Sequence, residues 1–158
     1  MKRFLPLLLV SLILASCNKI VYNDTRSFNN STWMRFEPET FEFSVKNIEK
    51  CYNIVATVKI DTTLYKGFDF PLVVDMQNDQ GEHRNFYAQI PLFNKQGLRT
   101  GEIVDSYQIV SSNIKEYFFF NTSGKQTMAI KQGTHKYDLN GVVNFGLKVE
   151  QANMKLPK

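Results

Sequence analysis

Along most of this chain apolar residues alternate with polar ones, and this period of two restricts the fold more than any other feature. The segments FEFSV (41–45), YNIVATVKI (52–60), KQTMAIKQ (125–132) and GVVNFGLKVE (141–150) all follow it. Successive side chains of an extended strand point to opposite faces, so each segment predicts a strand with one buried face and one wet face. Two more segments, 70–76 and 83–93, flank the turn signal at 78–81 and predict a hairpin.

Seven or eight such segments follow one another at roughly ten-residue intervals, and the only hint of a helical period is a weak one at 106–116. This pattern is typical of an all-β protein. We expect a single-domain antiparallel β-sandwich, with a jelly-roll arrangement favoured over a closed barrel.

The N-terminus, MKRFLPLLLVSLILASCNK, has the layout of a secretion signal. Lys2 and Arg3 precede an apolar run over 4–14, which is too short to span a bilayer. Small residues and Cys17 follow, and Leu14-Ala15-Ser16-Cys17 resembles a bacterial lipobox, in which the cysteine sulfur is lipidated and the chain is cut before it. We predict a lipoprotein signal peptide over 1–16 and lipid on Cys17; the alternative is an ordinary cleaved signal followed by a chance cysteine.

The segment 17–32 is rich in Asn, Ser and Thr, and we expect it to be a lipidated tether that lifts a β-sandwich domain, residues 33–158, off the membrane. Lipid would be the only membrane attachment, since no later apolar run approaches spanning length.

Charge and cysteine content exclude several classes of function. Loss of Lys2 and Arg3 with the signal lowers the formal charge from +4 to +2, and no basic stripe remains, so a nucleic-acid partner is not expected. With Cys17 lipidated, Cys51 has no partner for a disulfide, and we expect it to be a buried thiol at a strand start.

No catalytic or cofactor motif is evident. His83 and His135 lie far apart in polar surroundings, without a nucleophile elbow or the paired ligands that zinc needs. Glu37, Glu39 and Glu42 are close in sequence, but the alternation places Glu42 on a wet face. The chain has no glycine-rich phosphate loop. We therefore expect neither an enzyme nor a metal or other cofactor.

The aromatic residues fall into two groups. Those within alternating strands are expected in the core: Phe41, Phe43, Phe118, Phe120 and Phe145. Those near loops or strand ends are candidates for a surface that binds a protein or a sugar: Trp33, Tyr65, Phe68, Tyr87 and Tyr107.

The chain resembles the GldH-like gliding-motility lipoproteins of Bacteroidetes over nearly the whole mature sequence. The resemblance rests on the lipobox, Tyr22, Trp33, YNIVATVKI and, above all, EYFFFNTSGKQTMAIKQGTHKYDLNGVVNFGLKVE. In that last segment, LNGV (139–142) and Gly146-Leu147 are similar to the family's L-x-G-[IV] and G-[LI] close. The chain is a divergent member, because GTHKYD stands where the family has a more basic stretch with a methionine.

The resemblance implies an outer-membrane lipoprotein with a non-catalytic β-sandwich, an accessory subunit of an envelope complex linked to gliding motility and type IX secretion. In this phylum an acidic run after the lipidated cysteine marks surface export. Residues 18–21 lack one, which favours the periplasmic face. Asp61-Thr62-Thr63 matches the phylum's O-glycosylation pattern and makes Thr62 a candidate site.

A second interpretation stays open at this point: a glycan-binding lipoprotein of a polysaccharide uptake system, since jelly-roll sandwiches often bind sugars. It would require a coplanar pair of exposed rings beside Asn, Gln or Asp. An exposed apolar patch or a bare edge strand would favour docking on proteins instead.

Overall fold

The structure is a computed structural model that describes residues 19–153. The signal peptide expected over 1–16 and the lipidation predicted at Cys17 therefore lie outside the described residues. Eight long strands carry the fold: β1 (Ile20–Ser27), β3 (Glu39–Val45), β4 (Tyr52–Asp61), β5 (Asp69–Asn78), β6 (His83–Pro91), β8 (Tyr107–Phe118), β9 (Gly124–Gln132) and β11 (Val142–Gln151). The short elements are a 3-10 turn (Asn29–Ser31), β2 (Thr32–Met34), β7 (Glu102–Val104) and β10 (Asp138–Asn140).

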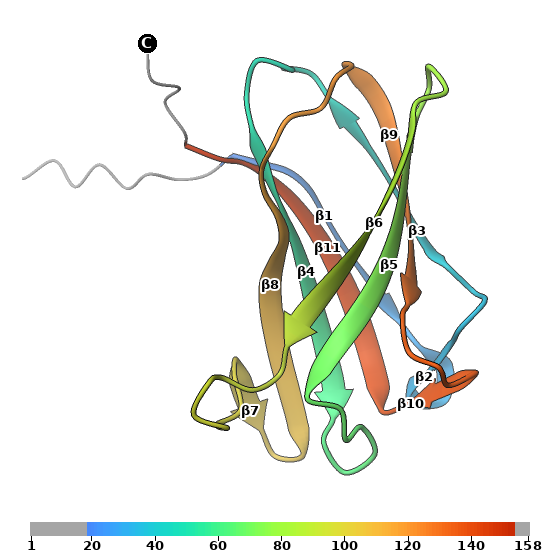
Figure 1. Cartoon of the computed structure of the whole chain (residues 1–158), viewed down its shortest axis with the longest axis vertical. Helices are drawn as coiled ribbons and strands as arrows, with labels where there is room; N and C mark the ends of the chain where they lie inside the picture. Colours follow the sequence, from blue (N-terminus) through green and yellow to red (C-terminus); the bar gives the residue numbers. More distant parts are fainter. Residues whose placement is uncertain (1–18, 154–158) are drawn as a thin grey trace, which may run out of the picture.

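Two antiparallel sheets face each other (Figure 1). One has the strand order β1-β11-β4-β8-β7 and the other β3-β9-β5-β6, while β2 and β10 form a separate pair. Among the eight long strands, the chain crosses from one sheet to the other at every step except from β5 to β6, which form a hairpin in one sheet. This order of eight strands is that of a jelly roll, so the predicted fold class is confirmed.

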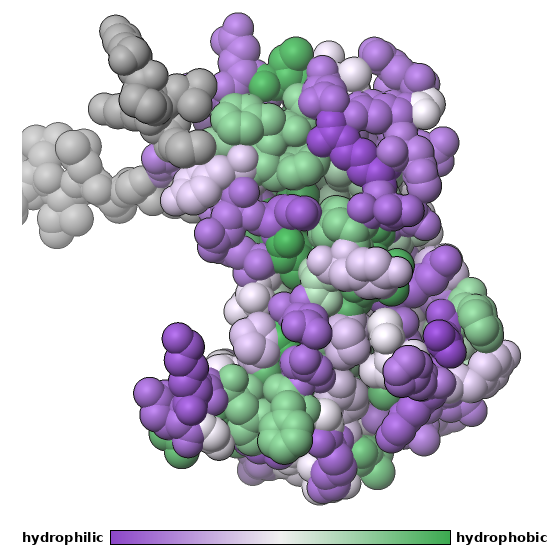
Figure 2. Space-filling model, viewed as in Figure 1, coloured by the Kyte–Doolittle hydropathy of each residue, from purple (hydrophilic) through white to green (hydrophobic). Residues whose placement is uncertain are grey.

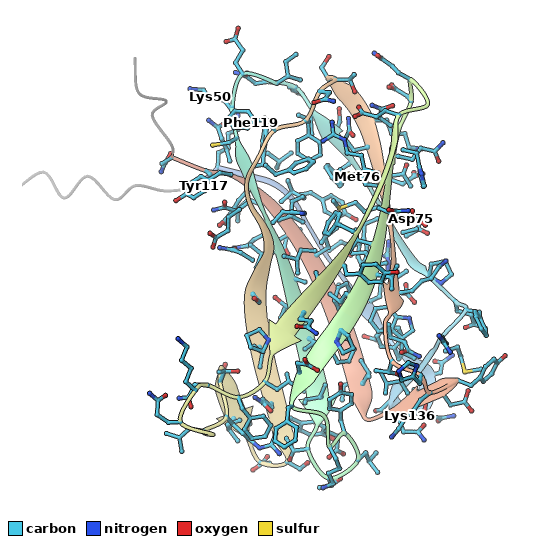
Figure 3. The ribbon with its side chains drawn as sticks, viewed as in Figure 1. Lys50, Asp75, Met76, Tyr117, Phe119 and Lys136 are labelled. Atoms are coloured by element: carbon cyan, nitrogen blue, oxygen red, sulfur yellow. The ribbon has the colours of Figure 1, made fainter. Side chains whose placement is uncertain are left out.

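The period of two in the sequence places the core between the sheets. Along β3, Phe41, Phe43 and Val45 are buried, and the residues between them are exposed. On β5, Met76 is buried, whereas the neighbouring Asp75 lies on the outer face, its carboxylate 2.8 Å from the His83 imidazole (Figure 3). Most side chains on the visible surface are hydrophilic, and apolar ones emerge at a few places only (Figure 2).

The weak helical period at 106–116 does not correspond to a helix, because residues from Tyr107 onward form β8. It pairs with β4, and the Thr57 and Ser111 hydroxyls are 2.7 Å apart across the pair. The alternation is hidden because Gln108, a polar residue, occupies an inward position, and because the pairing shifts register near the end of the strand.

The prediction of a tether over 17–32 is wrong from residue 20 onward, because these residues are part of the folded domain. Residues Ile20–Ser27 form β1, which pairs with β11 from Ile20↔Glu150 to Ser27↔Asn144. Even Lys19 is held, since its carbonyl accepts a hydrogen bond from the Gln151 amide at 2.8 Å. The polar composition of this segment reflects an edge strand with one solvated face.

Cys51 lies immediately before β4, and its thiol is buried and unpaired, as predicted. The five ring residues expected in the core are placed there, with Phe118 at its margin. His83 and His135 are both exposed, in agreement with their interpretation as surface histidines.

Candidate interaction surface

Two of the five aromatic residues expected at a binding surface are buried, so that part of the prediction is wrong. Trp33 is 1% exposed; its ring stacks on Phe28 at 4.7 Å, and its indole N–H donates to the Glu37 carbonyl at 3.0 Å. Although β2 is only three residues long, it carries this ring between the sheets, where it also meets Phe70 and Phe145. Trp33 is a core residue with its one polar group satisfied.

Tyr65 is the second buried ring. It is 5% exposed, packs against Phe70 at 5.5 Å and donates its hydroxyl to the Asp69 carbonyl at 2.6 Å. Burial raises the pKa of Tyr65 to about 12. The ring closes the base of the β4–β5 loop and is not available to a ligand.

The other three aromatic residues reach solvent but do not come together. Phe68, in the β4–β5 loop, is 81% exposed, and Tyr87, on the outer face of the β5–β6 pair, is 85% exposed. Tyr107 is half-buried on the outer face of the opposite sheet, with the Lys59 ammonium 4.5 Å from its ring centre. Of the three, only Phe68 belongs to an apolar cluster.

That cluster lies at the end of the sandwich where β4 ends and β8 begins, and we call it the distal apolar surface. Green side chains are exposed there beside β7 in Figure 2. Besides Phe68, its members are exposed or half-exposed residues of the β6–β7 loop and β7: Phe93, Leu98, Ile103 and Val104. These four residues stand among turn residues without a period, so the sequence did not predict them as part of a surface.

A buried glutamine fixes the loop that carries this surface. Gln108 is fully buried, and its amide N–H groups donate to the carbonyls of Leu92 at 2.8 Å and Thr100 at 2.9 Å. Its carbonyl accepts from the Arg99 guanidinium at 2.6 Å. The side chain thus ties both ends of the β6–β7 loop to β8, and all its hydrogen-bonding groups are used.

The tip of the loop is a tight turn built on Asn94. Its side-chain oxygen accepts from the amides of Gln96 at 3.0 Å and Leu98 at 2.9 Å. After the tip, Gly101 has a φ of +72°, and a Cβ atom there would lie 2.1 Å from the Ile109 carbonyl oxygen, so no other residue fits. The exposed apolar side chains are therefore displayed on an ordered scaffold, as at protein interfaces where little conformational entropy is lost on binding.

Two pairs of solvent-accessible rings lie at this end of the sandwich, and their geometry does not match the coplanar pair that the glycan interpretation requires. Phe68 and Phe93 lie 5.6 Å apart but are tilted by 58°, and the Arg99 guanidinium covers Phe93 at 4.8 Å. At the same end of the sandwich, the exposed pair Phe36–Tyr137 has an interplanar angle of 60°. Neither pair forms the flat platform on which a sugar ring stacks.

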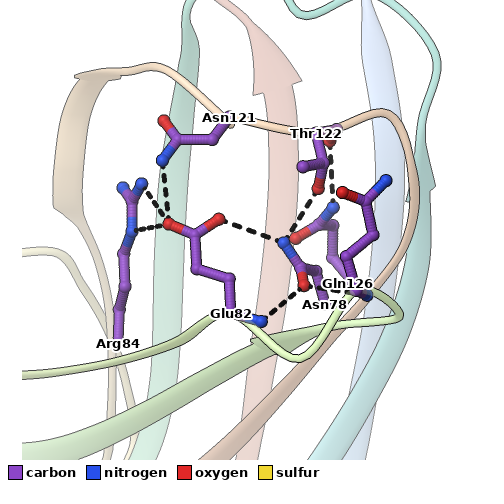
Figure 4. A network of polar contacts seen from close by, with 7 residues as sticks. Asn78, Glu82, Arg84, Asn121, Thr122 and Gln126 are labelled. Atoms are coloured by element: carbon purple, nitrogen blue, oxygen red, sulfur yellow. Dashed lines mark hydrogen bonds and ion pairs between the residues drawn. The ribbon is translucent and has the colours of Figure 1, made fainter.

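A polar cluster at the end of the sandwich opposite the distal apolar surface connects two loops through hydrogen bonds (Figure 4). The Glu82 carboxylate accepts from Arg84 Nε at 2.7 Å, Asn121 Nδ2 at 2.8 Å and Asn78 Nδ2 at 3.0 Å. Asn78 Nδ2 also reaches the Thr122 hydroxyl at 2.8 Å. These bonds join the β5–β6 hairpin to the β8–β9 connection, and neighbouring side chains already occupy the carboxylate.

The remaining candidates are scattered. Among residues 19–153, no three His, Cys, Asp or Glu side chains are grouped closely enough to hold a metal ion. The Thr62 hydroxyl donates to the Ser106 carbonyl at 2.8 Å, and its glycosylation stays a prediction. Beside it, the Thr63 hydroxyl lowers the pKa of Asp61 below its ordinary value.

Within the described part of the chain, no helix has the length and apolar character to cross a bilayer.

Fold and surface together define a jelly-roll domain that presents a rigid apolar loop surface at one end. The model of the GldH lipoprotein family matches residues 20–149, and the chain belongs to that family. It is thus a membrane-anchored lipoprotein related to gliding motility.

Two similar solved structures are distant from this chain in sequence. An Eiger TNF structure from S. frugiperda has 10% identity and a TM-score of 0.46, with 89% of this chain and 98% of that chain covered. The CBM22-1–GH10 modules of Clostridium thermocellum xylanase 10B, complexed with xylohexaose, have 12% identity and a TM-score of 0.39, with 90% of this chain and 30% of that one covered. No curated protein sequence matches the chain.

Proposed function

We propose that this protein is a non-catalytic accessory subunit of an envelope complex, anchored by lipid on Cys17 to the periplasmic face of the outer membrane. Its sandwich docks on a partner protein of the machinery that supports gliding motility and type IX secretion. Family membership supports the envelope setting, and the distal apolar surface is the observation that carries the docking role.

The distal apolar surface suits a protein partner because its rings are exposed yet held in place. Phe68 is anchored through its own carbonyl, which accepts from the Leu92 amide at 3.1 Å. Arg99, beside it, is held by Gln108 and covers Phe93. Aromatic and aliphatic side chains with an arginine at their margin are the composition of residues that contribute most of the binding energy in protein interfaces. The expected partner therefore presents an apolar segment to this surface and a carboxylate to Arg99.

Site-specific photo-crosslinking in living cells tests the docking role. A photoreactive phenylalanine analogue replaces Phe68 in the native, lipid-anchored protein, and Tyr87 is the matched control because its ring is equally exposed but lies away from the surface. We expect a discrete crosslinked envelope protein from position 68 and none from position 87. Equal crosslinking from both positions, or none from 68, would contradict docking through this surface.

Co-purification from mildly solubilised envelopes gives an independent measurement. We expect the wild-type protein and the Tyr87→Ser variant to recover the same envelope proteins, and the Phe68→Asp variant to lose them while it remains folded and membrane-bound. If Phe68→Asp still recovers the complex in full, the partner binds elsewhere.

A further inference from the structure

The described chain is tied into the sandwich almost from its first residue. The Lys19 carbonyl already accepts from Gln151, and β1 begins at Ile20. Only three residue steps separate Ile20 from Cys17, a reach of about 10 Å in a fully extended chain. If Cys17 carries the lipid, as the proposed function requires, the end of the sandwich at which β1 begins cannot stand clear of the membrane.

Three segments meet at this end: the start of β1, the β3–β4 loop and the end of β8. The Ala152 amide donates to the Cys51 carbonyl at 2.9 Å, and Tyr52 is paired with Phe118. Lys19, immediately before β1, and Lys46 of the β3–β4 loop line one cleft. Figure 3 places Lys50, Tyr117 and Phe119 together at this end of the molecule.

Large apolar side chains and lysines are exposed here side by side. Ile20 is 55% exposed, Ile48 42%, Tyr117 50% and Phe119 36%. The same end carries the exposed residues Lys19, Lys46 and Lys50, and also Glu49 and Glu116. Aromatic rings with lysines at their margin are the composition of membrane interfaces, where rings lie at headgroup level and ammonium groups reach lipid phosphates.

The rings of Tyr117 and Phe119 are held toward solvent, because the rings that alternate with them pack into the core. In the sequence Tyr117-Phe118-Phe119-Phe120, the second and fourth rings pack on each other at 4.9 Å, and Phe120 is buried. Tyr117 has a φ of +49°, a left-handed conformation that is unusual for an aromatic residue, and its amide donates to the Asn53 side chain at 3.1 Å. Such an outlier persists only where its surroundings determine it, and here it holds the Tyr117 ring outward.

We propose that this anchor-proximal surface, consisting of Ile20, Ile48, Tyr117 and Phe119 with Lys19, Lys46 and Lys50, rests on the lipid bilayer. Its apolar side chains enter the headgroup layer, and its lysines meet anionic lipid phosphates. The sandwich then stands upright on the membrane. Because β4 and β11 each run ten residues between the two ends, the distal apolar surface lies about 30 Å from the bilayer.

Fluorescence quenching in vesicles tests this orientation. The full lipidated protein, in a Cys51→Ala background, receives a single cysteine in place of Ile48 or Phe119, and in place of Phe68 or Tyr87 as controls, each labelled with a polarity-sensitive dye. The vesicles contain phosphatidylethanolamine, phosphatidylglycerol and a lipid that carries a quencher on its acyl chain. Since amphipathic surfaces enter the interface by about 5–10 Å, we expect a blue shift and loss of roughly half the emission at 48 and 119, and little change at 68 and 87.

Flotation of the same samples separates the possible failures. If the protein floats with the vesicles but positions 48 and 119 are not quenched, the anchor is intact and the orientation is wrong. If it does not float, the anchor fails, and both this inference and the anchored form of the proposed function are overturned. A blue shift that grows with protein density and occurs without lipid quenching would assign the surface to contacts between copies, and would also overturn the proposal.

Discussion

Replacement of Gln108 by leucine should release the β6–β7 loop, because it puts an apolar side chain of similar volume in place of the buried amide. The substitution removes the donor to the Thr100 carbonyl and one of two donors to the Leu92 carbonyl, which keeps the Thr100 amide at 3.0 Å. It also removes the acceptor of the Arg99 guanidinium, which water can replace because Arg99 is exposed. A buried carbonyl left without a donor costs about 1–3 kcal/mol, and the second lost bond adds about 1 kcal/mol. Because the Thr100 carbonyl is only partly buried, we expect a loss of about 2–3 kcal/mol in the free energy of unfolding.

Urea unfolding of the purified mature protein, followed by tryptophan fluorescence, measures this loss. For a domain of this size the denaturant slope is about 1–3 kcal/mol/M in urea, so the midpoint should fall by about 1–2 M. Amide hydrogen exchange should show faster exchange confined to residues 92–106, since the loop is then no longer tied to β8. The control is Gln89→Leu, at an exposed position on β6, which should leave both measurements unchanged.

Two results would refute the role of Gln108: unfolding of Gln108→Leu at the wild-type urea concentration, or unchanged exchange rates in 92–106. Either result would mean that other contacts order the loop, and that the distal apolar surface does not depend on this glutamine.

Three further substitutions test other parts of the structure. Gly101→Ala should destabilise the protein by about 2–4 kcal/mol, because a positive φ and a clash with the Ile109 carbonyl add together; a thermal melt that matches wild type would contradict the close approach. Trp33→Ala should cost about 3–5 kcal/mol in chemical denaturation, whereas Phe36→Ala, at a ring 70% exposed, should cost little, and similar losses in the two would show that Trp33 is not a core residue. Tyr65 must be protonated in the folded protein up to a pKa of about 12, whereas an unfolded tyrosine ionises near 10, so the stability it contributes should decline as pH rises from about 10 to 12. Tyr65→Phe should lower stability at pH 8 and weaken this decline, and an unchanged pH dependence would refute the assignment to Tyr65.

Alternation of apolar and polar residues made most of the long strands predictable. In β3 and β9 burial follows the period of two, because each strand has the core on one face. In β4 and β11 the period is interrupted by three consecutive buried residues, 54–56 and 145–147. The hairpin at Asn78–Gly81 has ordinary turn residues. The edge strand β1 was missed for the opposite reason: a strand with few buried positions needs few apolar residues, and Asn23-Asp24-Thr25 is indistinguishable in composition from a loop.

The binding surface was less predictable than the fold. Trp33 and Tyr65 stand in segments without a period of two, and the folded structure shows that they are buried, Trp33 against Phe145 and Tyr65 against Phe70. The distal apolar surface joins Phe68 to side chains more than 20 residues later, and the glutamine that holds them together is a polar residue in the core. Such an arrangement has no signature in local sequence because it depends on how loops from different strand pairs meet.

The pairing of β1 with β11 has a mechanical consequence. If the lipid holds the start of β1 and a partner pulls at the far end of the sandwich, the load runs along the strands, and β1 is sheared against β11 over the whole length from Ile20 to Ser27. Antiparallel hydrogen bonds lie perpendicular to the strands, so a shear force strains all of them at once instead of opening them one after another. A protein attached in this way can transmit tension between a membrane and a machine without first unravelling from its anchored end.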